Sequence, residues 1–330
     1  MSSPRVSWLL PVRDGRRWLA ACVASVLADS GPHDELLVVD DGSTDGPGDL
    51  LPADPRVRLL QQPALGISAA LEHGRREARG TWLARIDADD EVLPGRLEAQ
   101  LALLRMRPRL AAIGGQAELV GDGAHEVPEG MRRYVDWVNG LTDLHRELLV
   151  ESPLFHPAVT LRASAVAEVG GWRDGDLPED YDLWLRLRRA GWALANLPQP
   201  VVRLRDRPGR LTRTDRRYRR KAFEALKLDH ASAELLPGKE RVVIWGAGRG
   251  GRPWLRRVLE HGAHVPMVID RFVQGERRGC PVRDPEALLG LDLDLLLVAV
   301  GARGGRARIR AELAQLRPDL VEGIHWWAVC

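Results

Sequence analysis

The sequence predicts an α/β fold divided into two domains, and three observations lead to this prediction. Short aliphatic runs alternate with helical stretches of about 10–15 residues, a pattern typical of βαβ units and of a mostly parallel sheet flanked by helices. The chain has 330 residues, whereas a single domain usually has about 100–200 residues. A new strand and a glycine-rich turn begin after residue 239, where we expect a second, smaller α/β domain.

The elements of the first domain follow from the apolar runs and the turn residues that bound them. Strands are expected at residues 6–10, 35–39, 57–60, 82–86, 110–113 and 159–162. Helices are expected at residues 18–27, 67–79, 97–105, 163–169 and 181–190. The region 121–150 is less regular and yields no clear element.

The composition excludes a largely disordered chain, because 45% of the residues are hydrophobic and 28% are charged, close to the globular average. No apolar run approaches the roughly 20 residues that span a bilayer. Pro11 and Arg13 interrupt the N-terminus before a signal-peptide core could form. The cysteines at positions 22, 280 and 330 are odd in number and scattered, which fits a reducing compartment. We therefore expect a cytoplasmic protein.

Two acidic clusters follow predicted strands. Asp40 and Asp41 end one strand, and Asp87, Asp89 and Asp90 follow another. In mostly parallel sheets ligands bind at the carboxyl ends of the strands. Crowded carboxylates repel one another unless a cation or water neutralises them, and Mg²⁺ or Mn²⁺ prefers such oxygen ligands. The alternative is a solvated acidic turn that caps the next helix.

Residues 203–221 form a strongly basic segment, with ten Arg or Lys against two Asp. The first interpretation is a solvated basic helix or loop, partly paired with the acidic first domain. The second is a patch that contacts anionic lipid at the inner face of a membrane. Nucleic acid is the third and least supported, because Tyr218 is the one aromatic residue in the segment and stacking on bases needs several.

Four stretches of the chain, in order, are similar to family 2 glycosyltransferases of the GT-A fold. They are VSWLLPVRDGRRWLAACVASVLA (6–28), ELLVVDDGSTDG (35–46), GISAALEHGRREARGTWLARIDADDEVLPGRLEAQ (66–100) and HPAVTLRASAVAEVGGWRDGDLPEDYDLWLRL (156–187). Each motif alone is weak, but four in register over residues 6–182 are specific. The resemblance implies a GT-A nucleotide-sugar transferase fold in the first domain.

The resemblance implies a donor site at the strand ends. Pro11 lies in the loop that borders the nucleotide base, and one of Asp40 and Asp41 accepts a hydrogen bond from the base, with Asp41 favoured. Asp87 and Asp89 match the Asp-X-Asp motif.

Within that motif, Asp87 resembles the ribose-side contact, and Asp89 resembles the ligand of Mn²⁺ or Mg²⁺ on the diphosphate, with Asp87 as a further metal ligand. Arg85 is a phosphate or sugar contact, or else the partner of a neighbouring carboxylate.

The resemblance also implies an acceptor side. Glu179 and Asp180 match the family's acidic pair, and Asp180 resembles the catalytic base. The alternative for this pair is N-terminal capping of the following helix. His156 matches a position near the acceptor or metal, although a lone histidine is more often structural. Trp172 either stacks on an acceptor sugar or belongs to the core.

The activity implied by the resemblance is a metal-dependent, inverting transfer of a sugar from a nucleotide-sugar donor, a UDP-sugar first, to a glycan or lipid-linked acceptor in bacterial surface polysaccharide synthesis. An inverting transfer needs a base for the acceptor hydroxyl and a cation for the leaving diphosphate. Two alternatives stay open. The chain is a catalytically inactive nucleotide-binding scaffold or regulatory protein, or it is a sugar-nucleotide oxidoreductase centred on the glycine-rich turn.

The second domain carries that turn. Gly246, Gly248 and Gly251 have dinucleotide-binding spacing after a strand at 241–245, and Asp270 stands where a ribose-binding acid would lie. The stretch resembles Rossmann-like modules appended to sugar-modifying enzymes. It binds NAD(P) or another nucleotide, or it is a docking or homo-oligomerisation module.

The further elements of this region are a helix to about residue 261, strands at 265–269 and 293–300, and a helix at 306–316. We thus expect a transferase domain at 1–202, a basic helical segment and linker at 203–237, and a Rossmann-like domain at 238–330.

Overall fold

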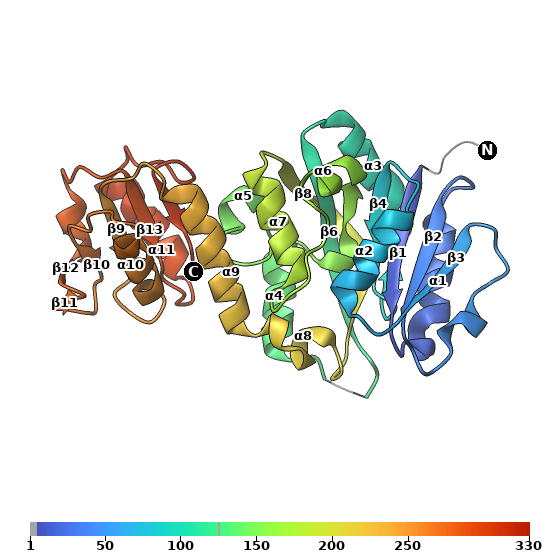
Figure 1. Cartoon of the computed structure of the whole chain (residues 1–330). Helices are drawn as coiled ribbons and strands as arrows, with labels where there is room; N and C mark the ends of the chain where they lie inside the picture. Colours follow the sequence, from blue (N-terminus) through green and yellow to red (C-terminus); the bar gives the residue numbers. More distant parts are fainter. Residues whose placement is uncertain (1–4, 125) are drawn as a thin grey trace. The chain divides into compact units, whose positions relative to one another are not determined.

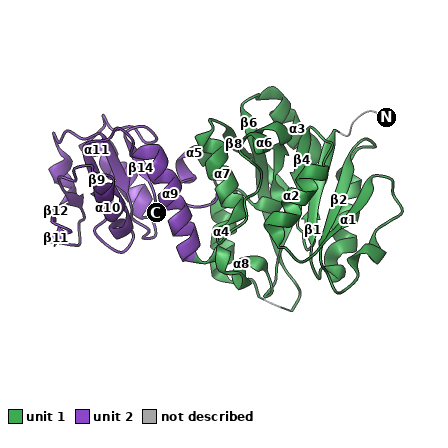
Figure 2. Ribbon diagram, viewed as in Figure 1, with its two compact units in different colours: residues 1–144, 153–219 green, residues 145–152, 220–330 purple. Residues whose placement is uncertain are grey.

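The computed structural model describes residues 5–124 and 126–330, and the chain divides into two compact units. Unit 1 comprises residues 1–144 and 153–219, and unit 2 comprises residues 145–152 and 220–330 (Figure 2). The expected linker at 203–237 is therefore shared between the units. Residues 203–219 fold with unit 1. Helix α9 (Arg220–Leu235) belongs to unit 2, because its buried side chains pack with α10 (Gly251–Glu260).

Unit 1 is an eight-stranded sheet with the strand order β3-β2-β1-β4-β7-β6-β8-β5. Its first four strands are parallel to one another, as predicted. They are β1 (Val6–Val12), β2 (Glu35–Asp41), β3 (Val57–Gln62) and β4 (Trp82–Arg85). The helices between and after them are α1 (Arg16–Asp29), α2 (Ile67–Glu77) and α3 (Arg96–Met106).

The other half of this sheet is mixed, which the prediction of a mostly parallel sheet did not anticipate. Strand β7 is antiparallel to both β4 and β6, β8 is parallel to β6, and β5 is antiparallel to β8. Hydrophobic periodicity reports that a segment is a strand but not its direction, which the connections decide. These strands are β5 (Glu91–Val92), β6 (Leu110–Gly121), β7 (Thr160–Arg162) and β8 (Ala193–Asp206).

Helices cover both faces of the parallel half (Figure 1). Leu19, Cys22 and Val26 of α1 join the cluster that contains Trp8 and Leu10 of β1. On the other face, α2 packs on β1 and β2. Each fully buried aliphatic side chain contributes about 1.5–3 kcal/mol, so the strands that end at the acidic clusters are held firmly.

The rest of unit 1 consists of helices and loops, and it contains the residues predicted for the acceptor side. Its helices, together with the short α5 that reaches into unit 2, are α4 (Glu129–Asn139), α5 (Leu144–Glu147), α6 (Ala163–Glu168), α7 (Glu179–Arg189) and α8 (Leu211–Thr214). Helix α4 lies in the region where the sequence yielded no element.

Unit 2 contains a second, smaller sheet with the order β11-β12-β10-β9-β13-β14, parallel except for the β11–β12 pair. The strands are β9 (Val242–Trp245), β10 (Val268–Ile269), β11 (Glu276–Arg277), β12 (Cys280–Arg283), β13 (Leu295–Val298) and β14 (Trp326–Ala328). Helices α9, α10 and α11 (Gly305–Leu316) accompany it. No helix in the described part of the chain is long and apolar enough to cross a membrane.

Candidate active site

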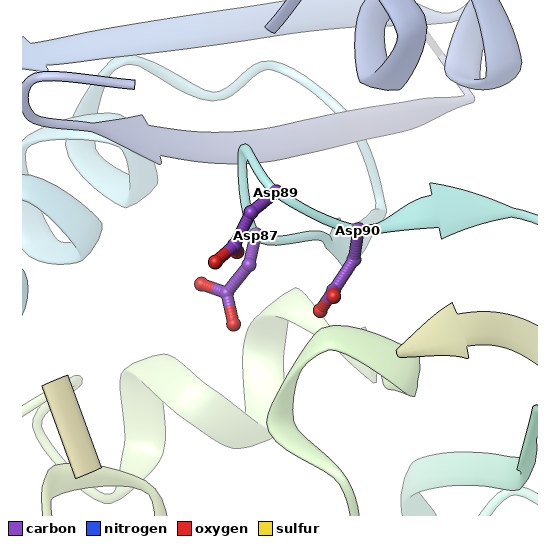
Figure 3. Close-up of side chains that lie close together, drawn as sticks. All are labelled: Asp87, Asp89 and Asp90. Atoms are coloured by element: carbon purple, nitrogen blue, oxygen red, sulfur yellow. The ribbon is translucent and has the colours of Figure 1, made fainter. Parts of the chain in front are cut away.

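An acidic turn follows β4. Asp87, Asp89 and Asp90 extend toward the same side of this turn, and one carboxylate oxygen from each lies within 4.8 Å of the others (Figure 3). Asp90 is buried; its Oδ1 accepts a hydrogen bond from the Arg205 amide at 2.7 Å, and its Oδ2 has no partner among the described residues. An unpaired buried oxygen beside two further carboxylates fits a hard divalent cation, which takes oxygen ligands.

The carboxylates of this turn are unequally compensated by positive charge. Burial, with the adjacent carboxylates of Asp89 and Asp87, raises the pKa of Asp90 well above its ordinary value. Burial acts on Asp87 in the same direction, but the guanidinium of Arg85, 2.5 Å away, outweighs it and holds the pKa of Asp87 below the ordinary value. A divalent cation would relieve the repulsion that burial strengthens.

The acidic turn does not cap the helix that follows it. Helix α3 begins after Gly95, and the amides of Gly95 and Leu97 donate to the carboxylate of Asp29 at 2.7 and 2.8 Å. The capping role considered for the turn is therefore taken by a residue at the end of α1.

Arginines from the end of β8 pair with the acidic turn. Arg207 Nε lies 2.6 Å from Asp89 Oδ2. Arg203 and Arg205 pair with Glu91 at 3.1 and 2.9 Å. Part of the basic segment 203–221 thus neutralises carboxylates of the same unit, as the solvated interpretation expected. A cation on Asp89 has to share that carboxylate with Arg207 or displace it.

The residues predicted to bind the nucleotide base lie at the ends of the neighbouring strands. Pro11 is half-buried near the end of β1, and Val12 is in register with Asp40 on β2. The carboxylate of Asp41 is occupied, because it accepts from Gln62 Nε2 at 2.7 Å and from two backbone amides of the following loop. Asp40 accepts from the Ser43 amide at 2.9 Å through Oδ1. Asp40 is therefore better able than Asp41 to accept a hydrogen bond from a ligand.

Glu179, the first residue of α7, is the centre of a buried network. Tyr218 Oη donates to Glu179 Oε2 at 2.6 Å, and His156 Nδ1 lies 3.5 Å from Oε1. Trp172 Nε1 donates to His156 Nε2 at 3.2 Å, so the proton of a neutral His156 lies on Nδ1 and faces Glu179. Burial lowers the pKa of His156, which agrees with the neutral ring.

Asp180 is half-buried beside this network. The N-cap residue of α7 is Pro178. Neither Glu179 nor Asp180 therefore has the capping role that was the alternative prediction from the sequence. Burial, followed by the adjacent charge of Glu179, raises the pKa of Asp180 to about 7. Burial alone would raise the pKa of Glu179 too, but its hydrogen bonds from His156 and Tyr218 lower it instead. The two carboxyl groups are therefore separated into a permanent anion and a group that can exchange a proton near neutral pH.

Arg85 connects the two acidic groups. Its buried guanidinium pairs with Asp87, and its positive charge also acts on Glu179 and Asp180. Its Nε and Nη1 atoms are buried and have no partner among residues 5–124 and 126–330. Buried donors are rarely left unsatisfied, so a ligand oxygen is expected there. Both sequence interpretations of Arg85, carboxylate partner and ligand contact, are compatible with this geometry.

Two residues of the site, Arg207 and Tyr218, were not identified from the sequence, and Asp90 was named there as part of the acidic cluster but not as its buried member. The excess of arginine in 203–221 was the signal for Arg207. Nothing in the sequence indicated that Tyr218 would reach Glu179, 39 positions away.

Comparisons with known proteins agree with this geometry. Residues 7–157 match the model of glycosyl transferase family 2. The putative glycosyltransferase EpsE of Bacillus subtilis is 30% identical over 219 residues, which cover 62% of this chain and 74% of EpsE. The amylovoran biosynthesis glycosyltransferase AmsE of Erwinia amylovora is 28% identical over 195 residues. The matched residues cover 57% of this chain and 70% of AmsE.

The chain belongs to glycosyl transferase family 2.

The solved structures support the GT-A fold of this family 2 glycosyltransferase. S. aureus TarS (residues 1–349), in complex with UDP-GlcNAc, superposes with a TM-score of 0.53 at 14% identity. The match covers 69% of this chain and 66% of the TarS chain. At this identity the likeness concerns the fold.

The family match ends at residue 157, before α7 and before the part of unit 2 at 220–330 where the predicted glycine-rich site lies. A Cβ at Gly246 would lie 2.7 Å from the Ala299 carbonyl oxygen, and one at Gly251 would lie 1.7 Å from that of Gly246. Gly248 has open space around it. Asp270 accepts from the backbone amides of Ala247, Phe272 and Val273. Close packing thus explains why positions 246 and 251 are glycine. The hydrogen bonds of Asp270 to loop amides explain why position 270 is an aspartate.

Proposed function

We propose that this family 2 glycosyltransferase transfers a sugar from a UDP-sugar with inversion, with the help of a divalent cation, to a glycan or lipid-linked acceptor in bacterial surface polysaccharide synthesis. The observation that carries the proposal is the position of Arg85, a buried cation with two unpartnered nitrogen atoms between the acidic turn and the acidic pair of α7. The diphosphate of a sugar donor is negatively charged, and the carboxylates on either side would repel it. A buried arginine between them would offset that repulsion.

The donor is bound at the strand ends. Pro11 and Asp40 border the base, with Asp40 now preferred to Asp41 because the latter's oxygens are already occupied. Asp87 contacts the ribose, and Arg85 contacts a phosphate or the sugar. UDP is chosen as the nucleotide because TarS, which shares the fold, was solved in complex with UDP-GlcNAc.

Asp89 and Asp87 would hold Mn²⁺ or Mg²⁺, with the free Oδ2 of Asp90 directed at the same cluster. When bound, such an ion stabilises the negative charge that develops on the leaving diphosphate. Asp90 is buried, and Asp87 and Asp89 are partly buried, which strengthens their interaction with any cation.

On the acceptor side, Asp180 accepts the proton of the attacking hydroxyl as the new glycosidic bond forms and the bond to the diphosphate breaks. Its pKa of about 7 suits this role, since the carboxylate must be present at working pH but basic enough to take a proton. Glu179, His156 and Trp172 form the hydrogen-bonded network beside Asp180. Trp172 is buried, so it acts by orienting His156 rather than by stacking on a sugar.

The acceptor class follows the relatives, since AmsE is named for amylovoran biosynthesis and TuaG of Bacillus subtilis for teichuronic acid biosynthesis. The membrane contact through 203–221, homo-oligomer formation and a second nucleotide site at Gly246–Gly251 stay predictions. No observation favours the scaffold or the oxidoreductase over the transferase.

Calorimetric titration of the full chain with UDP, with Mn²⁺ or with EDTA, tests the donor half of the proposal. We expect binding that requires the metal and that weakens in Asp40→Ala. A ligand at 100 times its Kd also stabilises the fold by about 2.7 kcal/mol, so a thermal-shift screen of nucleotide sugars should show UDP-sugars above the others. Equal binding of UDP by the wild type and Asp40→Ala, or in EDTA, contradicts this assignment.

A further inference from the structure

A cavity in unit 2 is lined by arginines that the transferase reaction does not use. Its volume is about 380 Å³, within the range of about 300–1,000 Å³ found for small-molecule sites. Five arginine residues line it: Arg249, Arg252, Arg256, Arg277 and Arg278. Pro253 and Leu255 provide an apolar part of the wall. These residues belong to α10, to the turn before it, and to β11 with the turn that follows it (Figure 1).

The charge of this cavity is not compensated. Within the described part of the chain, Arg249, Arg252, Arg277 and Arg278 have no carboxylate at ion-pair distance, and Arg256 reaches Glu260 at 3.7 Å. Several arginines elsewhere in the same unit do have such partners, although Arg283, Arg303 and Arg308 have none among the described residues.

Those paired arginines show what the cavity lacks. Arg257 pairs with Asp229 at 2.6 Å, Arg310 with Glu322 at 2.8 Å and Arg317 with Asp319 at 2.7 Å. Like charges gathered without partners repel one another, and an anion with several charges would remove that repulsion.

One of the five arginines is held in place before any ligand binds. Arg277 donates from Nε to the Ala247 carbonyl at 3.1 Å and from Nη1 to the Glu276 carbonyl at 2.9 Å. A fixed donor loses less entropy on binding. Arg278 has φ of 49° because it forms, with Gly279, the two-residue turn between β11 and β12.

The glycine-rich turn beside the cavity does not supply the ligand groups itself. The carboxylate of Asp270 is occupied by three backbone amides, and Gly246 and Gly251 serve close packing. Recognition in this unit therefore has to come from the arginine side chains. Guanidinium forks bind phosphate oxygens in pairs, with charge-assisted hydrogen bonds.

We propose that this cavity is a second binding site, separate from the transferase site, for a diphosphate group carried by a small molecule or by a lipid. Several uncompensated guanidinium groups around one cavity match a compact anion with more than one negative charge. The two sources share this chemistry, and the experiment separates them.

The test uses the full chain in EDTA, so that a metal-dependent site contributes little. Titration with inorganic pyrophosphate is compared between the wild type, an Arg252→Ala/Arg278→Ala variant and an Arg303→Ala/Arg308→Ala control. The control removes the same charge from exposed residues of unit 2 that do not line the cavity. In parallel, the three proteins are sedimented with vesicles of phosphatidylcholine alone or mixed with a long-chain prenyl diphosphate, a lipid that carries the diphosphate group.

We expect the cavity variant to bind pyrophosphate about tenfold to a hundredfold more weakly than the wild type, and the control to bind as the wild type does. Pyrophosphate binding without vesicle binding identifies a soluble ligand. Binding to the anionic vesicles that is lost in the cavity variant alone identifies a lipid headgroup. The proposal is overturned if the wild type binds neither probe, or if the cavity variant and the control bind both probes equally.

Discussion

Asp180 is the residue on which the proposed transfer chemistry depends most. It lies one position from Glu179, yet the two carboxyl groups have opposite pKa shifts, because only Glu179 receives hydrogen bonds from His156 and Tyr218. This separation lets Glu179 stay charged while Asp180 gains and loses a proton near pH 7. The Trp172–His156 hydrogen bond supports it by fixing the ring of His156.

Asp180→Asn should reduce sugar transfer about 10²- to 10⁴-fold, the usual contribution of a general base. In the wild type, activity should rise with pH through about 7, because Asp180 acts as a base only when it has lost its proton. Asp176→Asn, an exposed residue nearby that pairs with Arg216, is the matched control and should keep full activity. A flat pH profile, or wild-type transfer by Asp180→Asn, would remove Asp180 from this role.

The spacing of short motifs predicted most of the individual site residues. Asp87, Asp89, Glu179 and Asp180 all lie at the ends of elements that the sequence defines. Their partners are less accessible to prediction. Arg207 lies 118 positions from Asp89, and only the fold brings them together. The preference between Asp40 and Asp41 likewise depended on the loop amides that occupy Asp41.

At the scale of elements, β8 changes the interpretation of the basic segment. The strand extends to Asp206, and it places Arg203 and Arg205 beside Glu91 and Arg207 beside Asp89. Alternation of apolar and charged residues over 201–206 was a signal for this strand. The high arginine content of the segment masks this alternation, because it is equally typical of a solvated basic loop.

Arg207→Gln should tighten Mn²⁺ binding about twofold to fivefold, because it removes a competitor for Asp89, and half-exposed ion pairs contribute about 0.2–1 kcal/mol. Calorimetric titration with Mn²⁺ measures this directly. Arg216→Gln, which breaks a surface pair with Asp176, should leave the affinity unchanged. Weaker Mn²⁺ binding in Arg207→Gln would show that the arginine assists the site rather than competing for it.

The glycine-rich turn of unit 2 offers a matched pair of substitutions. Gly251→Ala places a methyl group 1.7 Å from the Gly246 carbonyl oxygen, whereas Gly248→Ala meets no atom within 4 Å. We expect the first to destabilise unit 2 by about 1–3 kcal/mol or more, and the second to leave its stability nearly unchanged. Urea denaturation followed by tryptophan fluorescence measures both. Equal loss of stability in the two variants would refute the packing role assigned to Gly251.

At the scale of the whole molecule, the two units differ in how the positive charge of their arginines is compensated. In unit 1 several arginines of the basic segment pair with carboxylates of the acidic turn after β4. In unit 2 four of the five arginines around the α10 cavity have no carboxylate at ion-pair distance among the described residues. The sequence predicted two domains and the parallel half of the first sheet. It did not predict that α9 would join unit 2, since its helical pattern shows no preference between the units.

The central claim is that the acidic turn after β4 supports metal-dependent transfer from a UDP-sugar. The most direct measurement is the release of UDP from a panel of UDP-sugars in the presence of Mn²⁺, by the wild type, by Asp89→Ala and by Asp174→Asn, an exposed acidic residue outside the cluster. We predict turnover by the wild type and by Asp174→Asn, its loss in EDTA, and a decrease of about 100-fold or more in Asp89→Ala. Turnover by Asp89→Ala at the wild-type rate would contradict this claim.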